Sequence, residues 1–324
     1  MDVKIGTFNL NNLFSRFDFQ GVIDALHGAP AEDVSFHYEF TDPADVRIRT
    51  FHGRLVKAKD EADTRTIAER IKEMDVDVLA VQEVENIDIL RKFNREHLDG
   101  MYATQVLIEG NDPRFIDVGI LSNLPVGAIS SYQTRVDPSD PAERVFSRDL
   151  LEVEILNASR SRKLFTLFNT HLKSNFVPFN EDQDTGHAAA NERRRRQAAA
   201  IAQIIAERMR PRSSYVLTGD MNDGPDSPFL APFVNDSEIA LHNALTNPAE
   251  TRPPKPESTG PGPQTTAWTH RFKPSGQPPK FELYDQIWLS PSLRDKQTGA
   301  MIGRRKNHKG DGSDHDPAWI TLRL

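Results

Sequence analysis

The fold class of this chain is decided by the stretch Val76-Asp77-Val78-Leu79-Ala80-Val81-Gln82-Glu83-Val84. Residues 76–81 are mainly apolar and β-branched, which predicts a strand buried inside the protein, and the carboxylate of Glu83 follows where that strand would end. Open α/β folds place their chemistry at the ends of strands. The stretch therefore predicts an α/β protein with a functional carboxylate at a strand end.

Five further stretches share this arrangement. Each ends or follows a short apolar run, and each puts a carboxylate, an imidazole or a carboxamide where a strand would end. They are Thr7-Phe8-Asn9-Leu10-Asn11, Asn169-Thr170-His171-Leu172, Gly219-Asp220-Met221-Asn222, Tyr284-Asp285-Gln286-Ile287 and Ser313-Asp314-His315. One such match carries little information, but six along one chain predict a single site for a metal ion and a phosphate.

These stretches also decide the domain organisation. The chain has 324 residues, enough for one large domain or two, but Asn9 and His315 belong to the same predicted site. We therefore expect one domain over residues 1–324, with two insertions. One covers about residues 14–60, which show no sustained period; the other, residues 247–279, holds nine prolines, which forbid regular structure and predict a surface loop over the mouth of the site.

The composition excludes several classes of protein. Hydrophobic residues make up 37% and charged residues 27%, as in soluble globular proteins. Cysteine is absent, which excludes disulfides, thiolate zinc sites and cysteine nucleophiles. No stretch approaches the roughly 20 apolar residues of a membrane span, and no signal peptide precedes the first strand, so we expect a cytoplasmic protein. The net charge of −7 argues against tight, non-specific binding of nucleic acid through its phosphates. The oligomeric state stays open.

Periodicity places the remaining elements. Helices are expected at residues 63–74, capped by Asp63 or Thr64, at 87–98, and most clearly at 188–209, where apolar residues form one stripe. Strands are more frequent than helices, a mixture that predicts two packed sheets with helices outside. Besides residues 76–81, the expected strands are 3–8, 102–108, 118–121, 150–156, 164–169, 215–218 and 318–322.

The six stretches, in this order, resemble the endonuclease/exonuclease/phosphatase superfamily. Its members include pancreatic-type deoxyribonucleases, abasic-site endonucleases, inositol polyphosphate 5-phosphatases and bacterial sphingomyelinases. The resemblance runs from Ile5 to Leu324, strong at the six stretches and weak between them. It implies a four-layer α/β/β/α sandwich of two packed mixed sheets with helices outside, and a metal-dependent phosphoesterase.

The resemblance assigns the metal ligands. Carboxylate and carboxamide oxygens suit Mg²⁺ or Mn²⁺, and the family places its principal metal ligand at the position of Glu83. Asn9 and Asp314 are further expected ligands, although an isolated Asn after a strand is usually a turn residue. Family members often carry Asp at the position of Asn11, so this departure leads us to place Asn11 beside the substrate phosphate.

The resemblance also assigns the catalytic groups. It implies that Asp220 orients or deprotonates the attacking water and that Asn222 holds water or phosphate, where an ordinary Asx turn is the alternative. It pairs Asp285 with His315, which favours the protonated ring; His315 then stabilises the pentacovalent phosphate or acts as acid or base. His171 is expected to contact phosphate or act as an acid, the alternative being a structural histidine at the strand end.

Phosphate contacts are expected from two cations. Lys173 points to the same side as His171 if the chain stays extended. Arg148 occupies a position where many nucleases of the family have a phosphate-contacting arginine. Trp268 either stacks on a base or packs under the proline-rich loop.

Two runs of positive charge each have two interpretations. The four arginines 193–196 fan around their helix, so they form a solvated helix end or supply one phosphate contact. Residues 292–310 carry six cations (Arg294, Lys296, Arg304, Arg305, Lys306 and Lys309) and one acid. This second run is either a solvated loop or a surface that steers anions toward the site.

The functional prediction is a divalent-metal-dependent phosphoesterase, in first place a phosphodiesterase or nuclease that uses in-line attack of water. Its partner would be a phosphodiester, with nucleic acid as one candidate. The alternatives are a phosphatase acting on a small phosphate ester or phosphoinositide, and a catalytically idle relative that only binds a partner.

Overall fold

The structure is a computed structural model that describes residues 1–324 except 15–58, 138–139, 178–181, 237, 259 and 309–310. The insertion expected at about residues 14–60 therefore lies, apart from its ends, outside the described residues. The helices are α1 (Glu61–Met74), α2 (Ile87–Glu96), α3 (Gln183–Arg208), α4 (Pro232–Asn235) and α5 (Pro291–Arg294). None of the described helices is both long enough and apolar enough to span a membrane.

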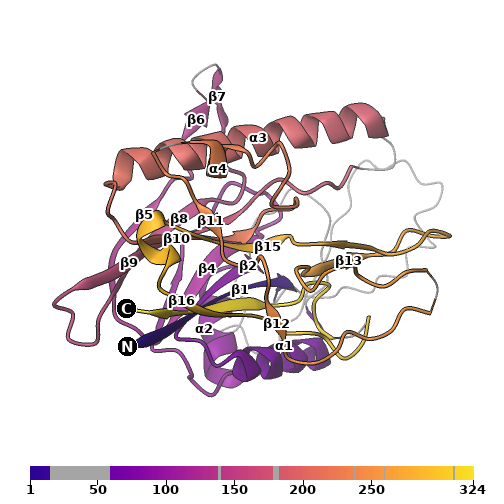
Figure 1. Ribbon diagram of the computed structural model, residues 1–324, viewed down its shortest axis with the longest axis horizontal. Coiled ribbons are helices and arrows are strands. Elements are labelled where there is room, and N and C mark those ends of the chain that lie inside the picture. Colours follow the sequence, from indigo (N-terminus) through magenta and orange to yellow (C-terminus); the bar gives the residue numbers. More distant parts are fainter. Residues whose placement is uncertain (15–58, 138–139, 178–181, 237, 259, 309–310) are drawn as a thin grey trace, which may run out of the picture.

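Two large sheets face each other at the centre of the molecule (Figure 1). The seven-stranded sheet has the order β12-β16-β17-β1-β2-β4-β3, and the six-stranded sheet has the order β11-β15-β10-β9-β8-β5. Both are mixed, because β1 is parallel to β2 but antiparallel to β17, and β10 is parallel to β9 but antiparallel to β15. In the seven-stranded sheet the bounds are β12 (Ala249–Glu250), β16 (Gln297–Ile302), β17 (Ala318–Arg323), β1 (Asp2–Leu13), β2 (Val78–Val84), β4 (Asp117–Ser122) and β3 (Thr104–Leu107). In the six-stranded sheet they are β11 (His242–Asn243), β15 (Asp285–Leu289), β10 (Tyr215–Asp220), β9 (Lys163–His171), β8 (Leu150–Leu156) and β5 (Val126–Ser131).

Two small hairpins complete the strands. They are formed by β6 (Val136–Asp137) with β7 (Asp140–Arg144) and by β13 (His270–Phe272) with β14 (Lys280–Glu282). The second hairpin lies beside the site, because His270 forms an isolated bridge with His315.

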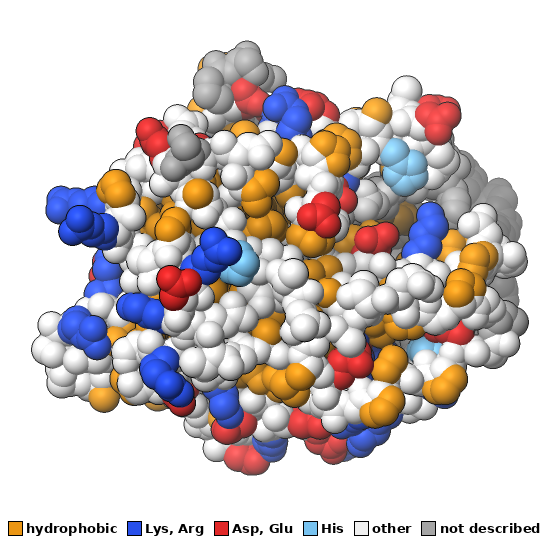
Figure 2. Space-filling model, in the orientation of Figure 1, with side chains coloured by type: hydrophobic (Ala, Val, Ile, Leu, Met, Phe, Trp, Pro, Cys, Tyr) orange, Lys and Arg blue, Asp and Glu red, His pale blue; other side chains and the backbone are white. Residues whose placement is uncertain are grey.

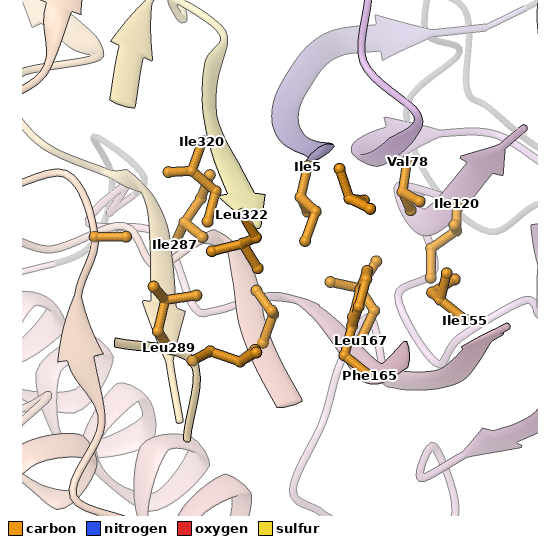
Figure 3. Close-up of a cluster of buried hydrophobic side chains, with 14 of the residues drawn as sticks. Ile5, Val78, Ile120, Ile155, Phe165, Leu167, Ile287, Leu289, Ile320 and Leu322 are labelled. Carbon is orange, nitrogen blue, oxygen red and sulfur yellow. The ribbon is translucent and has the colours of Figure 1, made fainter. Parts of the chain in front are cut away.

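Three apolar clusters separate the layers. The central cluster joins the inner faces of the two sheets, with side chains such as Ile5 and Ile120 on one side and Leu167 and Ile287 on the other (Figure 3). A second cluster lies between the seven-stranded sheet and helices α1 and α2, and a third between the six-stranded sheet and helices α3 and α4. The layer order is therefore α/β/β/α, which confirms the fold that the resemblance implied.

Strand alternation also explains where the polar residues lie. Successive side chains of a strand point to opposite faces, so on β1 Ile5 belongs to the central cluster and Phe8 to the helix-covered one. Asn9 lies an even number of residues after Ile5, so its side chain also points between the sheets. On β10, Asp220 lies an even number of residues after Val216, which belongs to the central cluster, so Asp220 points between the sheets as well. At this end of the sandwich the inter-sheet layer changes from apolar to polar.

The polar end begins with hydrogen bonds between the two sheets. Gln82 of β2 donates from Nε2 to Oδ1 of Asn169 on β9, at 2.8 Å. Asn169 donates from Nδ2 to the carbonyl oxygens of Val81 and Gly119, at 3.1 and 2.8 Å. These contacts satisfy buried amides and fix the spacing of the sheets directly beneath the site.

Three boundaries differ from the sequence prediction. Helix α1 is capped by Asp60, whose Oδ1 accepts from the backbone N–H of Ala62 at 2.8 Å, and not by Asp63 or Thr64. Helix α3 begins at Gln183 rather than residue 188, because Asp182 caps it by accepting from the N–H of Thr185. Despite its prolines, the segment 247–279 contains the short strands β12 and β13, so the expectation of no regular structure there was wrong.

Candidate active site

Four polar side chains from distant parts of the chain meet at the polar end of the sandwich. Asn9 comes from β1, Asp220 from the end of β10, Asp285 from the start of β15, and His315 from the loop before β17. Asn9 donates from Nδ2 to Oδ2 of Asp220 at 2.9 Å, a hydrogen bond that crosses between the sheets. The loop of His315 is tied to β1, because the Ser313 hydroxyl donates to the carbonyl oxygen of Asn9 at 2.7 Å.

His315 is surrounded by carboxylates. Its Nδ1 lies 2.6 Å from Oδ2 of Asp285, so the pair that the resemblance implied is hydrogen-bonded. Its Nε2 lies 3.8 Å from Oδ2 of Asp220 and 4.0 Å from Oδ1 of Asp314. Burial lowers the pKa of His315, but the charges of Asp285 and Asp220 outweigh it and raise that pKa to about 10. The ring is therefore positively charged at neutral pH.

His171 has the opposite protonation state. Its Nε2 lies 3.5 Å from the same Oδ2 of Asp220. Burial, followed by the positive charge of Arg148, holds the pKa of His171 well below its usual value. The carboxylate of Asp220 thus lies between a charged imidazole, His315, and a neutral one.

The turn after β10 presents Asp220 to both rings. Gly219 has φ +135°, and a Cβ there would lie 1.9 Å from the carbonyl oxygen of Thr170, so only glycine fits. Asn222, with φ +52°, donates its backbone N–H to Oδ1 of Asp220 at 2.9 Å and its Nδ2 to the carbonyl oxygen of Leu172 at 3.1 Å. Asn222 therefore lies beside Asp220 and forms the Asx contact that was the alternative to a catalytic role.

Glu83 lies across the site from these groups. It is half-buried, has φ +62°, and accepts from the backbone N–H of Asn12 at 3.0 Å. Asn11 and Asn12 also have positive φ, where the pairing of β1 with β2 shifts register. Such unusual backbone conformations cluster at functional sites.

The electrostatics around Glu83 suit a cation. Burial raises the pKa of Glu83, and the negative charges of Asp314 and Asp220 raise it further. Burial also raises the pKa of Asp220. Carboxylates gathered in this way repel one another unless a cation lies between them. The oxygen donors present therefore fit a hard divalent cation.

A second set of ligand atoms lies nearby. Among the described residues, the ligand atoms of His270, Asp314 and His315 lie within 4.8 Å of one another. Desolvation raises the pKa of Asp314, but His270 and His315 hold it below its usual range. A metal ion on this set would use the imidazole nitrogen of His315 that faces Asp220, so it would compete with the contact between those two groups.

The cations expected to contact phosphate have partners in this structure. Arg148 is 2% exposed, with Nε 3.1 Å from Oδ2 of Asp112, and it donates from Nη1 to the carbonyl oxygen of Leu172 at 3.1 Å. Lys173 is half-buried and donates from Nζ to the carbonyl oxygen of Ser174 at 2.9 Å. Burial, followed by the charge of Arg148, lowers the pKa of Lys173 to about 8. Asn11 uses its backbone N–H to donate to Oδ1 of Asn9 at 2.9 Å. The phosphate role of all three stays a prediction.

Two of the six cations in the run before Ser313 are buried, whereas Arg294, Lys296 and Lys306 are exposed. Arg304 and Arg305 are 2% and 5% exposed, and both form ion pairs with the fully buried Asp316. The interpretation of these arginines as a solvated or steering surface was wrong, because their charges are paired with a carboxylate inside the protein. Trp268 is 3% exposed with Arg304 over its ring at 3.7 Å, so it packs under the proline-rich loop. Lys309 lies outside the described residues.

The helix arginines also have defined partners. Arg194 is 1% exposed and donates to Asp223 and to the carbonyl oxygen of Lys173. Arg195 pairs with Glu192, and Arg196 with Asp137 and Glu143. The solvated-end interpretation therefore fails for Arg194, which instead supports the segment that follows His171.

Two residues of the site, His270 and Lys59, were not predicted from the sequence. The ring of His270 stacks on Tyr284 at 4.9 Å and lies 4.9 Å from the ring of His315. Lys59 donates from Nζ to the carbonyl oxygen of Asn11 at 2.6 Å. Burial lowers the pKa of Lys59, whereas the charges of Asp63, Glu83 and Asp314 raise it. No pattern marks either residue, because one lies within a proline-rich segment and the other within an aperiodic one.

The comparisons with known proteins agree with this geometry. Residues 6–315 match the sequence profile of the Endonuclease/Exonuclease/phosphatase family, a range that contains all six stretches. The chain belongs to this family. No curated protein matches it in sequence.

Solved structures of the family share the fold at low sequence identity. An endonuclease/exonuclease/phosphatase from Bacteroides vulgatus has a TM-score of 0.60 and 16% identity, covering 100% of this chain and 99% of that one. The structure of D. rerio TDP2 with a single-strand DNA product has a TM-score of 0.55 and 13% identity, covering 100% and 99%. A mannosyl-6-phosphatase of Bacteroides thetaiotaomicron has a TM-score of 0.55 and 14% identity, covering 99% and 100%.

Proposed function

We propose that this protein is a divalent-metal-dependent phosphodiesterase that hydrolyses nucleic acid by in-line attack of water. Family membership supports a phosphoester hydrolase. The observation that carries the proposal is the set of contacts around Asp220 of the six-stranded sheet. Asp220 accepts a hydrogen bond from Asn9 of the seven-stranded sheet and lies 3.8 Å from the charged His315, which is paired with Asp285.

The metal site in this proposal consists of Glu83, Asn9 and Asp314. Their oxygens suit Mg²⁺ or Mn²⁺, and the raised pKa of Glu83 supports a cation at this place. The ion would neutralise negative charge on a phosphate oxygen. We prefer this set to the one containing His315, because it leaves the imidazole free to face Asp220 and the substrate.

The remaining side chains of the site have separate catalytic roles. Asp220 orients the attacking water and accepts its proton, with Asn222 holding the adjacent oxygen. His315, kept charged by Asp285, meets the negative charge that develops on the phosphate. The neutral His171 donates a hydrogen bond to a phosphate oxygen. In this proposal Arg148, Lys173 and Asn11 contact the substrate phosphate.

Nucleic acid is the first candidate substrate, and a small phosphate ester is the second. A relative with the same fold, D. rerio TDP2, was solved with single-strand DNA, whereas another relative is a mannosyl-6-phosphatase with the same TM-score. Fold similarity at these identities does not separate the two. The two candidates differ in whether the scissile phosphate carries one ester bond or two.

The test compares bis-p-nitrophenyl phosphate with the mono-ester in EDTA, Mg²⁺ and Mn²⁺. We expect hydrolysis of the bis-ester that EDTA abolishes and either ion restores, and much slower hydrolysis of the mono-ester. Preference for the mono-ester would replace the diesterase with a phosphatase. Absence of turnover on both esters and on oligonucleotides, in either ion, would leave the idle binding relative and contradict the proposal.

A further inference from the structure

A basic cavity lies outside the site described so far. It has a volume of about 490 Å³ and is lined by Lys255, Arg271, Lys273, Asn307 and His308. Three of these side chains are permanent cations and none is an acid. The whole protein carries a net charge of −7. Figure 2 shows both basic and acidic side chains on one face of the molecule, whereas the lining of this cavity contains no acidic side chain.

Internal contacts hold the walls of this cavity in place. Arg271 donates from Nε and Nη2 to the two carboxylate oxygens of Glu257, at 2.5 and 2.7 Å. Glu257, whose side chain is 3% exposed, also lies 3.3 Å from Nε2 of His308. Lys255 donates from Nζ to Oδ1 of Asn307 at 3.4 Å, which links the proline-rich segment to the loop that leads to His315. The cationic groups are therefore ordered by contacts behind the cavity, as in a prepared binding site.

The cavity is connected to the catalytic centre by strand β13. His270 of this strand lies with its ring 4.9 Å from that of His315, and Arg271, the next residue, lines the cavity. Successive residues of a strand point to opposite faces, so Phe272 is on the same face as His270. Phe272 is 56% exposed, an unusual environment for a large aromatic side chain. The hairpin therefore carries His270 and the exposed ring of Phe272 on one face, and Arg271, which lines the basic cavity, on the other.

We propose that the basic cavity binds a second phosphate of a single-stranded nucleic acid whose scissile phosphate lies at His315, and that a base of the same strand stacks on Phe272. The inference rests on the proposed function and names the substrate class for it. A single strand repeats phosphates with unpaired bases between them, and proteins bind it with cationic grooves and aromatic platforms. A small monoester has one phosphate and cannot reach both places.

The test uses the full chain with Lys255→Ala and Lys273→Ala combined. Binding of a fluorescent single-stranded oligonucleotide of about ten nucleotides is measured by anisotropy in EDTA, so that binding is followed without turnover. We expect Kd to rise about tenfold or more, and the slope of log Kd against log salt to fall by about 0.7, since the contact with one phosphate is lost. Phe272→Leu should weaken binding at least about fivefold, with little change in the salt slope.

The matched control is Lys4→Ala combined with Lys163→Ala, which removes the same charge. These half-exposed lysines lie near the starts of β1 and β9, five and eight residues before Asn9 and His171, or about 17 and 26 Å along the strands. The control should bind the oligonucleotide like the wild type, and both double variants should hydrolyse the bis-ester like the wild type. If the control weakens binding as much as the cavity variant, or if the cavity variant binds normally, the subsite is excluded.

The outcome is separable from that of the proposed function. Hydrolysis of the bis-ester in Mg²⁺ or Mn²⁺, together with an unchanged Kd for the cavity variant, would retain the diesterase and reject the second phosphate site. Equal losses in bis-ester hydrolysis and oligonucleotide binding would mean that the two lysines maintain the fold, which also rejects it.

Discussion

Replacing Asp285 with Asn should bring the pKa of His315 down toward physiological pH. The substitution keeps the shape of the side chain but removes the charge that lies 2.6 Å from Nδ1. The pKa of about 10, against an ordinary value of 6.5, corresponds to roughly 5 kcal/mol of preference for the charged ring. Asp285 is the nearest of three carboxylates, so we assign it at least half, about 3 kcal/mol. Removing about 3 kcal/mol should bring the pKa of His315 in the variant from about 10 down to about 8 or below.

Proton linkage gives the sign of the effect on stability. The folded-state pKa of His315 is above the unfolded value, so the stabilisation from this ring is fully present below about pH 6.5. It is lost as the pH rises from about 6.5 through about 10. Asp285→Asn should therefore lower the free energy of unfolding by about 3 kcal/mol near pH 6, and the difference from the wild type should shrink above pH 10.

The assay is an NMR titration of ¹³C-labelled histidine in EDTA, together with urea unfolding at several pH values. The resonance of His315 is assigned by its absence in His315→Asn. Asp2→Asn, which removes a charge from an exposed ion pair with Arg323, serves as the control and should change neither quantity. A wild-type ring that titrates near 6.5, or a variant in which the ring stays charged to pH 10, would refute the reasoning.

Two further substitutions test what holds the site together. Asp316→Asn leaves three buried arginines without their shared carboxylate. It should therefore lower the free energy of unfolding in urea by about 3–5 kcal/mol or more. The control, Asp75→Asn at an exposed ion pair, should lower it by less than about 1 kcal/mol. Similar small losses in both variants would show that Asp316 is not required. Gly219→Ala forces a Cβ against a backbone oxygen at positive φ and should destabilise the protein by at least about 3 kcal/mol. Gly262→Ala, where the space around the glycine is open, should be nearly neutral. Equal stability of the two variants would contradict the strained turn.

The sequence predicted the parts of the site that depend on local pattern. Apolar runs that end in Asn9 or Asp220 identify strands, and the two-residue period then assigns each of these side chains to a face. A single histidine with a distant carboxylate, His315 with Asp285, became predictable only through the resemblance, since no local rule joins residues 30 positions apart.

The parts that depend on packing could not be predicted. Arg304 and Arg305 have the composition of a solvated charge run, and only the fold brings Asp316 and Trp268 to them. His270 lies within the proline-rich segment and has no periodic signal, and its place beside His315 comes from long-range contacts, among them an isolated bridge. Long-range pairing of this kind has no counterpart in residue spacing.

The most direct test of the metal-dependent centre is the Mn²⁺ concentration dependence of bis-p-nitrophenyl phosphate hydrolysis by the wild type and by Glu83→Gln. We expect the chelated wild type to be inactive and to regain turnover as Mn²⁺ is added. The variant should need a much higher Mn²⁺ concentration and should turn over orders of magnitude more slowly. Identical activation curves for the two proteins, or full activity of either one in EDTA, would contradict a metal centre built on Glu83.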